Sequence, residues 1–190
     1  LPDMLQSIKR QLYTNIEHII IDDGSTDNSH NLLKEYGKEN SYTKIIINQD
    51  NCGCVAKLRN QAVKVSSGEY IMNIDSDDIL YSDAISTLVE KAKSDHLDLT
   101  YGSMIYIDQY GSPHKPSQLV GSKYQFGYLI KKMFIPAPRM YKKEIFDLTD
   151  GYNEKLNNAD DWDLYLQIEE KTHQIGWAGP RPLFAYRKIE

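Results

Sequence analysis

Three carboxylates within four positions follow a short apolar run near the middle of the chain. Residues 70–74 have the side chains typical of a strand, and Asp75, Asp77 and Asp78 come directly after them. Ionised carboxylates this close repel one another, so a cation between them would be favourable. Mg²⁺ and Mn²⁺ prefer oxygen ligands and keep positions for water and phosphate oxygens. Asp75 and Asp77 are therefore candidate metal ligands, and a solvated acidic turn is the alternative.

A second acidic pair closes an earlier apolar run. Asp22 and Asp23 follow three isoleucines, and Gly24 and Ser25 come next. A carboxylate here could accept a hydrogen bond from the imide N–H of a base or from a sugar hydroxyl. Capping of the next helix is the alternative, and it accounts for Ser25 but not for both acidic residues. The pair indicates a nucleotide-like ligand.

Two further groups could act together with these carboxylates. Arg59 falls on an expected helix after a glycine-containing turn, and its planar guanidinium suits phosphate, although a lone arginine on a helix is usually solvated. Asp160 and Asp161 open a later helix. A carboxylate there could act as a general base toward a hydroxyl, or simply complement the positive end of the helix dipole.

The elements that must position these groups alternate between strand and helix. Strands are expected at residues 17–22, 44–48, 70–74 and 98–107, and helices at 1–13, after Asp27, at 55–65 and at 83–94. The alternation indicates an α/β fold with a mostly parallel central sheet flanked by helices. Open sheets of this kind bind ligands at the carboxyl ends of their strands. We therefore expect Asp22, Asp75 and Asp77 to converge on one cleft.

The pattern changes after residue 107. Residues 108–123 read as a long polar loop, followed by a helix at 124–133, a proline-broken strand at 135–141, a helix at 160–170 and strands at 173–178 and 183–187. A loop of that length in a compact domain is often functional. At 190 residues, the chain is expected to be a single domain.

Composition excludes several functions. The net charge is −5 and no basic run stands out, so nucleic-acid binding is not expected. No apolar run is long enough to span a membrane, and no dinucleotide or P-loop motif occurs. Cys52 and Cys54 are expected to be reduced thiols, and the five histidines to be surface or structural residues. We expect a cytoplasmic location, with membrane attachment only through parts of the protein outside this chain.

Together these segments resemble the inverting family 2 glycosyltransferases, which have a GT-A fold. The segment Asp22 to Asp27 is similar to the family's VDDGSTD, and the run from Asn51 to Asp78 is similar to its N-x-G, ARN, GEYI and LDSDD in order and spacing. Asp160-Asp161-Trp162 resembles its EDWDL with Asp in place of the usual Glu, and Tyr186-Arg187 resembles its late YR. The resemblance covers nearly the whole chain.

The resemblance implies a metal-dependent, inverting transfer of a sugar from a nucleoside diphosphate sugar, expected to be a UDP-sugar. The acceptor would be a hydroxyl of a carbohydrate or lipid-linked molecule in polysaccharide or glycoconjugate synthesis. By the resemblance, the catalytic base is Asp161, the nucleotide-binding residues are Asp22, Asp23, Arg59, Asp75 and Asp77, and the ligands of Mn²⁺ or Mg²⁺ are Asp77 and Asp75. Residues 1–107 would bind the nucleotide sugar and residues 108–190 the acceptor.

Family members begin with a strand that lies in the middle of the sheet, whereas this chain starts inside the helix that should follow it. We therefore expect a fragment with a gap in its sheet, whose open edge could pair with a second copy to form a homodimer.

Two alternative functions stay open. A haloacid-dehalogenase-like phosphatase also places D-x-D after a strand, but Ile79 stands where it needs Thr or Val. The other alternative is a non-catalytic nucleotide-binding fragment.

Overall fold

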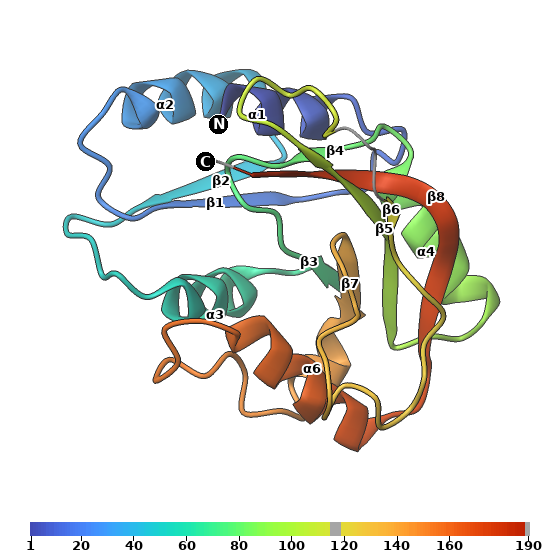
Figure 1. Cartoon of the computed structure of the whole chain (residues 1–190). Coiled ribbons are helices and arrows are strands. Elements are labelled where there is room, and N and C mark those ends of the chain that lie inside the picture. Colours follow the sequence, from blue (N-terminus) through green and yellow to red (C-terminus); the bar gives the residue numbers. More distant parts are fainter. Residues whose placement is uncertain (115–118, 189–190) are drawn as a thin grey trace.

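Two hydrogen-bonded groups of strands form the framework of the molecule, and helices pack around them (Figure 1). The computed structural model describes residues 1–114 and 119–188, so part of the expected loop at 108–123 lies outside the described residues. Strands β1 (His18–Asp22) and β2 (Thr43–Ile47) pair in parallel. The larger sheet has the order β3–β7–β5–β8–β4, and β6 pairs with β5.

The larger sheet is mixed rather than mostly parallel. Its strands are β3 (Tyr70–Met72), β4 (Ile79–Leu80), β5 (Leu99–Ile107), β6 (Leu119–Val120), β7 (Arg139–Lys142) and β8 (Ile175–Arg187). Strands β5 and β8 are parallel, whereas β3 with β7, β5 with β7, β5 with β6, and β4 with β8 are antiparallel. The expectation of a mostly parallel sheet is wrong here, because β6 and β7 both lie antiparallel to β5, and antiparallel neighbours need no crossover helix.

Most of the expected helices are present, but the first ends at Lys9 and not at residue 13, one expected helix is absent, and the short helix Lys143–Phe146 was not expected. They are α1 (Pro2–Lys9), α2 (Ser29–Glu39), α3 (Val55–Val65), α4 (Ala84–Ser94), α5 (Lys143–Phe146) and α6 (Asp160–Lys171). The helix expected at 124–133 is absent, because Gly127 takes a left-handed φ of 73° and the segment bonds to α6 instead. Membrane spanning is not supported by any helix of the described residues, since none is both long and apolar enough.

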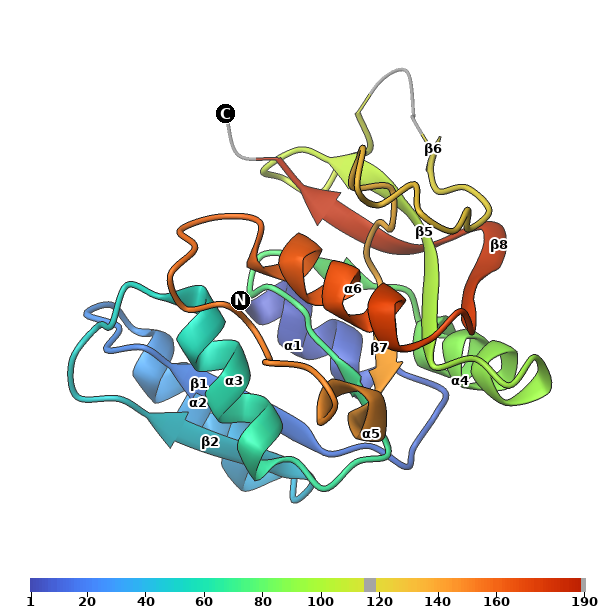
Figure 2. The same cartoon turned by 90° about the horizontal axis from the view of Figure 1, so that it is seen from below.

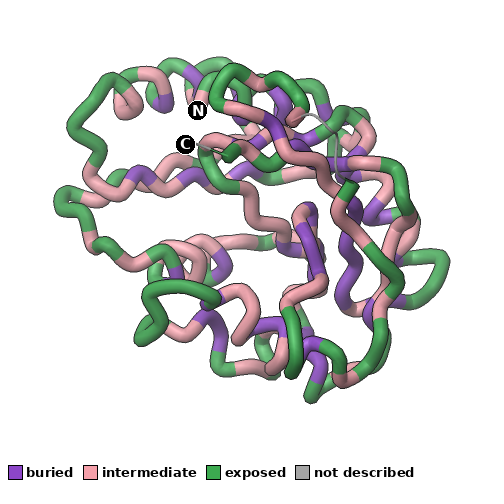
Figure 3. The backbone as a smooth tube through the Cα atoms, in the orientation of Figure 1, coloured by how far each residue is buried: buried purple, intermediate pink, exposed green. Residues whose placement is uncertain are grey.

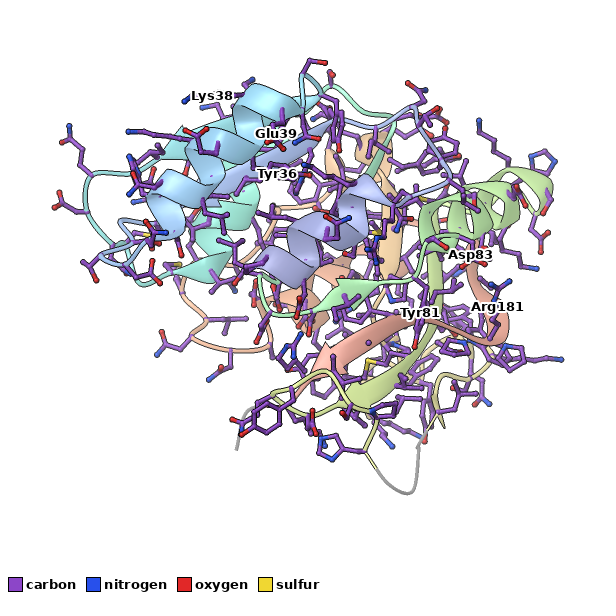
Figure 4. The ribbon with its side chains drawn as sticks, turned by 90° about the horizontal axis from the view of Figure 1, so that it is seen from above. Tyr36, Lys38, Glu39, Tyr81, Asp83 and Arg181 are labelled. Carbon is purple, nitrogen blue, oxygen red and sulfur yellow. The ribbon has the colours of Figure 1, made fainter. Side chains whose placement is uncertain are left out.

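Strand β8 runs unbroken where two short strands were expected. A register shift against β5 lies between Tyr101 and Met104, and it lets β8 continue through residues 179–182 between the two expected strands. Near this register shift, Arg181 of β8 pairs with Asp83, the residue just before α4, at 2.6 Å (Figure 4). Strand β8 therefore contacts the start of α4 through Arg181 and the acidic segment after β3 through Arg187.

Two clusters of buried side chains form the core. One packs α1, α2 and α4 against β1, β4 and β8, and it includes Leu5, Leu33 and Leu88. The other packs α3 and α6 against β5 and β7, and it includes Tyr141 and Leu164. Figure 3 shows the concentration of buried residues along β5 and β7. Helix α6 is therefore anchored on the buried centre of the larger sheet.

A gap separates the two groups of strands. Among the described residues, β1 pairs only with β2, and β3 only with β7. A cavity of about 430 Å³ lies between β1 and β3 and is lined by residues of both strands and of α1 and α3. Glu17 bridges one end by accepting a hydrogen bond from the Gly68 backbone N at 2.6 Å. The gap expected from the sequence is present, and pairing of a second copy along it stays a prediction.

Candidate functional site

The acidic turn between β3 and β4 presents two carboxylates and buries a third. Asp75 is exposed and Asp77 is half-buried, whereas Asp78 is only 3% exposed. The backbone N of Arg187 donates to Asp78 Oδ1 at 2.8 Å, and its Nε donates to the Asp77 carbonyl at 2.7 Å. Burial raises the pKa of Asp78 to about 7, and the charges of Asp77 and Asp75 add to this rise. Asp78 therefore supports the turn, and Asp75 and Asp77 are its accessible carboxylates.

Asp75 and Asp77 fit a hard divalent cation in donor type and in exposure. Mg²⁺ is typically bound through one or two carboxylates, with water and substrate phosphates completing the shell. Within residues 1–114 and 119–188, no group of three or more His, Cys, Asp or Glu side chains could hold a metal ion. The pair therefore suits a cation shared with a phosphate-bearing ligand and not a closed metal centre made by protein alone.

Asp22 is a buried, ionised acceptor at the carboxyl end of β1. Its Oδ1 accepts a hydrogen bond from the Ser25 backbone N at 2.9 Å, and its Oδ2 lies 3.4 Å from His30 Nδ1. Burial acts to raise the pKa of Asp22, but the Ser25 hydrogen bonds and His30 together lower it below its ordinary value. Asp22 is thus charged at neutral pH despite being 3% exposed.

Asp23 is engaged within the chain through both of its oxygens. One accepts from Asn48 Nδ2 and the other from the Cys52 backbone N, each at 3.0 Å. These bonds hold the pKa of Asp23 below its usual value. Gly24 adopts a left-handed φ of 73°, and a Cβ there would lie 2.9 Å from the Asn51 backbone N. Asp23 and Gly24 therefore tie the end of β1 to the loop after β2.

Arg59 on α3 links the acidic turn to the start of α6. Its Nη1 donates to Asp160 Oδ2 at 2.9 Å, and its Nη2 donates to Asp75 Oδ1 at 3.2 Å. Its guanidinium also lies 5.6 Å from the ring centroid of Tyr152. A cationic side chain is thereby fixed beside the candidate metal ligand, where a phosphate group could be recognised.

Asp161 is paired with an arginine that the sequence analysis did not single out. Arg139 Nη1 donates to Asp161 Oδ2 in a short ion pair, and the Trp162 backbone N donates to Asp161 Oδ1 at 2.8 Å. Arg139 also lies over the ring of Tyr165, 5.2 Å from its centroid. Burial acts to raise the pKa of Asp161, but Arg139 and, further away, Arg59 outweigh burial and lower it. Asp161 is therefore ionised at neutral pH and able to accept a proton.

The backbone before α6 aims the two adjacent carboxylates in different directions. Ala159 has a φ of 61°, in the left-handed region that non-glycine residues rarely adopt. Successive helical positions are about 100° apart, and Asp160 turns to Arg59 while Asp161 turns to Arg139. Strain at such a position is often retained at functional sites.

Two cavities meet at Arg59 and Asp75. The cavity of about 430 Å³ is also lined by Asp22 and Asp23, whereas a smaller one of about 40 Å³ is also lined by Arg139 and Asp161. Asp160 and Asp77 line neither. The structure thus brings Asp22 and Asp75 to one cavity, and Asp75 also lines the cavity of Asp161; the expected convergence of Asp77 on the same cavity is not seen, because its side chain lines neither.

Sequence reasoning missed two contacts of the site. His30 was interpreted as a surface or structural residue, yet it lies beside Asp22 because α2 packs back over the end of β1. Arg139 offered one signal, since it is a charged residue entering a strand of the core directly after a proline. His18 is structural as interpreted, and burial lowers its pKa to about 4. Cys52 and Cys54 are both free thiols.

Comparisons with known proteins agree on one family and one fold. A sequence profile described as "Glycosyl transferase family 2" matches residues 1–152. Chondroitin synthase of Escherichia coli is 31% identical, with 87% of this chain and 24% of the relative covered. The poly(ribitol-phosphate) beta-glucosyltransferase of Bacillus spizizenii is 34% identical, with 92% of this chain and 31% of the relative covered. The chain spans about a quarter to a third of the length of these relatives.

Solved structures share the fold at low sequence identity. S. aureus TarS in complex with UDP-GlcNAc superposes with a TM-score of 0.82 at 19% identity, covering 100% of this chain and 55% of TarS. TarS in complex with UDP gives a TM-score of 0.80 at 19% identity, covering 98% of this chain and 56% of that one. The expected α/β fold of the GT-A type is confirmed.

Proposed function

From the premise that the chain belongs to glycosyl transferase family 2, we propose that it transfers a sugar from a nucleoside diphosphate sugar to an acceptor hydroxyl. The observation that carries the proposal is the meeting of the two cavities at Arg59 and Asp75. One cavity leads to the ionised acceptor Asp22, and the other to the ionised carboxylate Asp161. Family membership sets the phosphatase alternative aside.

The proposed donor is a UDP-sugar. A buried, ionised Asp22 suits the imide N–H of uracil, because a charged acceptor forms a stronger hydrogen bond than a neutral one. Asp75 and Arg59 also line this cavity between β1 and β3, and we place the ribose and the diphosphate beside them. The complexes of TarS with UDP and UDP-GlcNAc support this choice of donor.

Asp77 and Asp75 would hold Mn²⁺ or Mg²⁺ together with the diphosphate. When bound, the cation would offset the negative charge that collects on the leaving diphosphate. Arg59 adds a fixed positive charge on the same side, and its bond to Asp75 keeps it there. Arg187 holds the turn that carries both candidate ligands.

Asp161 would take the proton of the acceptor hydroxyl. Because Arg139 keeps its carboxylate ionised and oriented, Asp161 is available as the general base. The hydroxyl oxygen would form a bond to the anomeric carbon as the bond to the diphosphate breaks. Attack from the face opposite the diphosphate inverts the configuration, the proton goes to Asp161, and the bonding electron pair leaves with the diphosphate.

The proposed acceptor is a carbohydrate or lipid-linked chain in polysaccharide or glycoconjugate synthesis, in the cytoplasm. The relatives named for chondroitin and for poly(ribitol-phosphate) support a polymeric acceptor.

A requirement for metal can be tested on the chain itself. We expect UDP to raise the melting temperature more in Mn²⁺ than in EDTA, because UDP should bind more tightly when the cation is present. A ligand present at 100 times its Kd stabilises the folded protein by about 2.7 kcal/mol.

The substitution Asp77→Asn should remove the metal-dependent part of this stabilisation. Asp95→Asn, in the exposed turn after α4, is the matched control and should keep it. Equal stabilisation by UDP in Mn²⁺ and in EDTA would contradict the metal role. Metal-dependent UDP binding without any sugar transfer by the whole protein would favour the non-catalytic alternative.

A further inference from the structure

Positive charge is concentrated on one segment of an acidic chain. Residues 119–143 contain six Lys or Arg and no Asp or Glu, although the whole chain has a net charge of −5. Arg139, Lys142 and Lys143 are paired with carboxylates. Lys123, Lys131 and Lys132 are exposed and form no ion pair within the part of the chain that the structure describes. Three cationic side chains therefore remain available to an external partner.

Large apolar side chains are exposed between these lysines. Phe126 is 64% exposed, Ile130 is 76% exposed and Tyr128 is 39% exposed. Leu129, in the middle of the group, is fully buried and fixes the segment to the core. Residues 123–132, called the basic ridge below, thus combine cationic, aromatic and aliphatic groups on one outward-facing segment.

Hydrogen bonds hold the basic ridge along α6. Near the end of the helix, Glu169 accepts from the Tyr124 hydroxyl at 2.6 Å and from the Gly127 backbone N at 3.1 Å. In its first turn, Trp162 Nε1 donates to the Leu129 carbonyl at 2.7 Å. The connection from β6 to β7, which contains the ridge, runs beside α6 in Figures 1 and 2. The ridge therefore runs from the end of α6 back to its start.

The ridge meets the first turn of α6, where the Leu129 carbonyl accepts from Trp162, the residue that follows Asp161. We propose that the basic ridge binds an acceptor polymer that carries carboxylate or phosphate groups, and guides its end to Asp161. This inference rests on the proposed function. Lysine side chains attract the anionic groups, and exposed aromatic rings offer apolar faces with a polar edge to the sugar units.

A polymer explains the ridge better than a lipid surface does. Anionic membranes also bind segments rich in lysine and aromatic residues. The ridge, however, is fixed by three hydrogen bonds to α6, the helix that carries Asp161. A membrane surface would need no such attachment to the helix of the proposed base.

The test is polymer binding in the absence of donor. Anionic alginate oligosaccharides and neutral maltodextrins of equal length are titrated into the chain. We expect measurable binding of alginate only, with an affinity that falls as salt rises because exposed charges are screened. The double substitution Lys131→Gln, Lys132→Gln should weaken alginate binding about tenfold, since two charged contacts are lost.

The matched control is Lys34→Gln, Lys38→Gln, which removes the same charge from the exposed face of α2 on the opposite side of the molecule (Figure 1). It should leave alginate binding unchanged, and both double variants should bind UDP like the parent chain. Because the polymer titration contains no nucleotide, its failure is distinguishable from a failure of donor binding.

Three results would overturn the proposal. They are equal binding of maltodextrin and alginate, equal loss of alginate binding in the α2 control, and unchanged alginate binding in the ridge variant. If the ridge variant loses only its binding to phosphatidylglycerol vesicles and keeps its binding to alginate, the ridge is a membrane surface and the acceptor role is wrong.

Discussion

Two pairs of adjacent aspartates, Asp22 with Asp23 and Asp160 with Asp161, are held in different ways. The first pair is held mainly by neutral donors, namely the backbone of Ser25 and Cys52 and the side chain of Asn48. The second pair is held by the arginines Arg59 and Arg139, each from a distant element. Asp22 and Asp23 both line the larger cavity, whereas only Asp161 of the second pair lines a cavity.

The difference follows from the two tasks that we propose. A carboxylate that recognises an uncharged N–H group can be stabilised by neutral hydrogen bonds without losing its net charge. A carboxylate that must stay ionised and aimed at a hydroxyl can be held by a fixed cation, which keeps it deprotonated at neutral pH and restricts its orientation. Substitutions at the first pair should therefore affect donor binding, and substitutions at the second pair or its arginines should affect turnover and stability.

The largest expected effect is the loss of turnover in Asp161→Asn. A positioned base typically contributes about 10²–10⁴-fold to the rate, and asparagine cannot accept the proton. Asp160→Asn should lower turnover much less, because Asp160 lines neither cavity. The measurement is sugar transfer by the whole protein. Full activity of Asp161→Asn together with an inactive Asp160→Asn would reverse the assignment.

The next effect is the loss of stability in Arg139→Met. Removing one partner of this largely buried, charged hydrogen bond should cost about 2 kcal/mol. The pKa of Asp161 is lowered in the fold, so the contribution of the pair is present above the ordinary pKa of a carboxyl and is lost as pH falls through the lowered one. The difference between parent and variant in urea unfolding should thus be large at neutral pH and shrink in acid.

Arg181→Met is the matched control for Arg139→Met. Arg181 pairs with Asp83, but its side chain is 74% exposed, and surface pairs contribute about 0–1 kcal/mol (Figure 4).

Arg139→Met should also move the acidic limb of the pH–rate profile to higher pH, because Asp161 loses the cation that lowers its pKa. An unchanged acidic limb would show that Arg139 has no part in tuning Asp161.

The two aspartate pairs also differ in how far the sequence predicts them. Asp22 and the acidic turn after β3 follow apolar runs, so local pattern alone locates them at strand ends. The bounds of α3 were likewise predicted to the residue, since a helical apolar face is a local signal. Of the neutral donors to this pair, Ser25 is three positions from Asp22, whereas Asn48 and Cys52 are 25 and 29 positions from Asp23.

The support of the second pair depends on long-range packing. Arg59 and Asp160 are separated by 101 positions, and neither residue carries a sequence signal of the other. The same limit explains the mixed sheet, because the pairing of β7 with β3 and β5 is decided by tertiary contacts and not by the alternation of strands and helices. It also explains the absent helix at 124–133, where bonds to α6 replace helical ones.

The smallest expected effect concerns the start of α6. Ala159 adopts a left-handed φ of 61° and supplies no side-chain cap. Asparagine tolerates this conformation and is favoured at the residue before a helix, so Ala159→Asn should raise the free energy of unfolding by about 1 kcal/mol. Ala159→Val should lower it, because a branched side chain disfavours the left-handed region. Urea unfolding of the two variants measures both changes in the free energy of unfolding. Equal changes in the same direction would show that the left-handed backbone of Ala159 is not strained.

The most direct test of the division between the two pairs is a calorimetric titration of UDP, in Mn²⁺, into Asp22→Asn and Asp161→Asn. Loss of a charged hydrogen bond is worth about 1.5–3 kcal/mol, so Asp22→Asn should weaken UDP binding at least about tenfold. Asp161→Asn should bind UDP like the parent chain, because its carboxylate faces the cavity shared with Arg139 and not the one shared with Asp22. An equal loss of affinity in both variants, or a loss in Asp161→Asn alone, would contradict the separation of donor and acceptor sites.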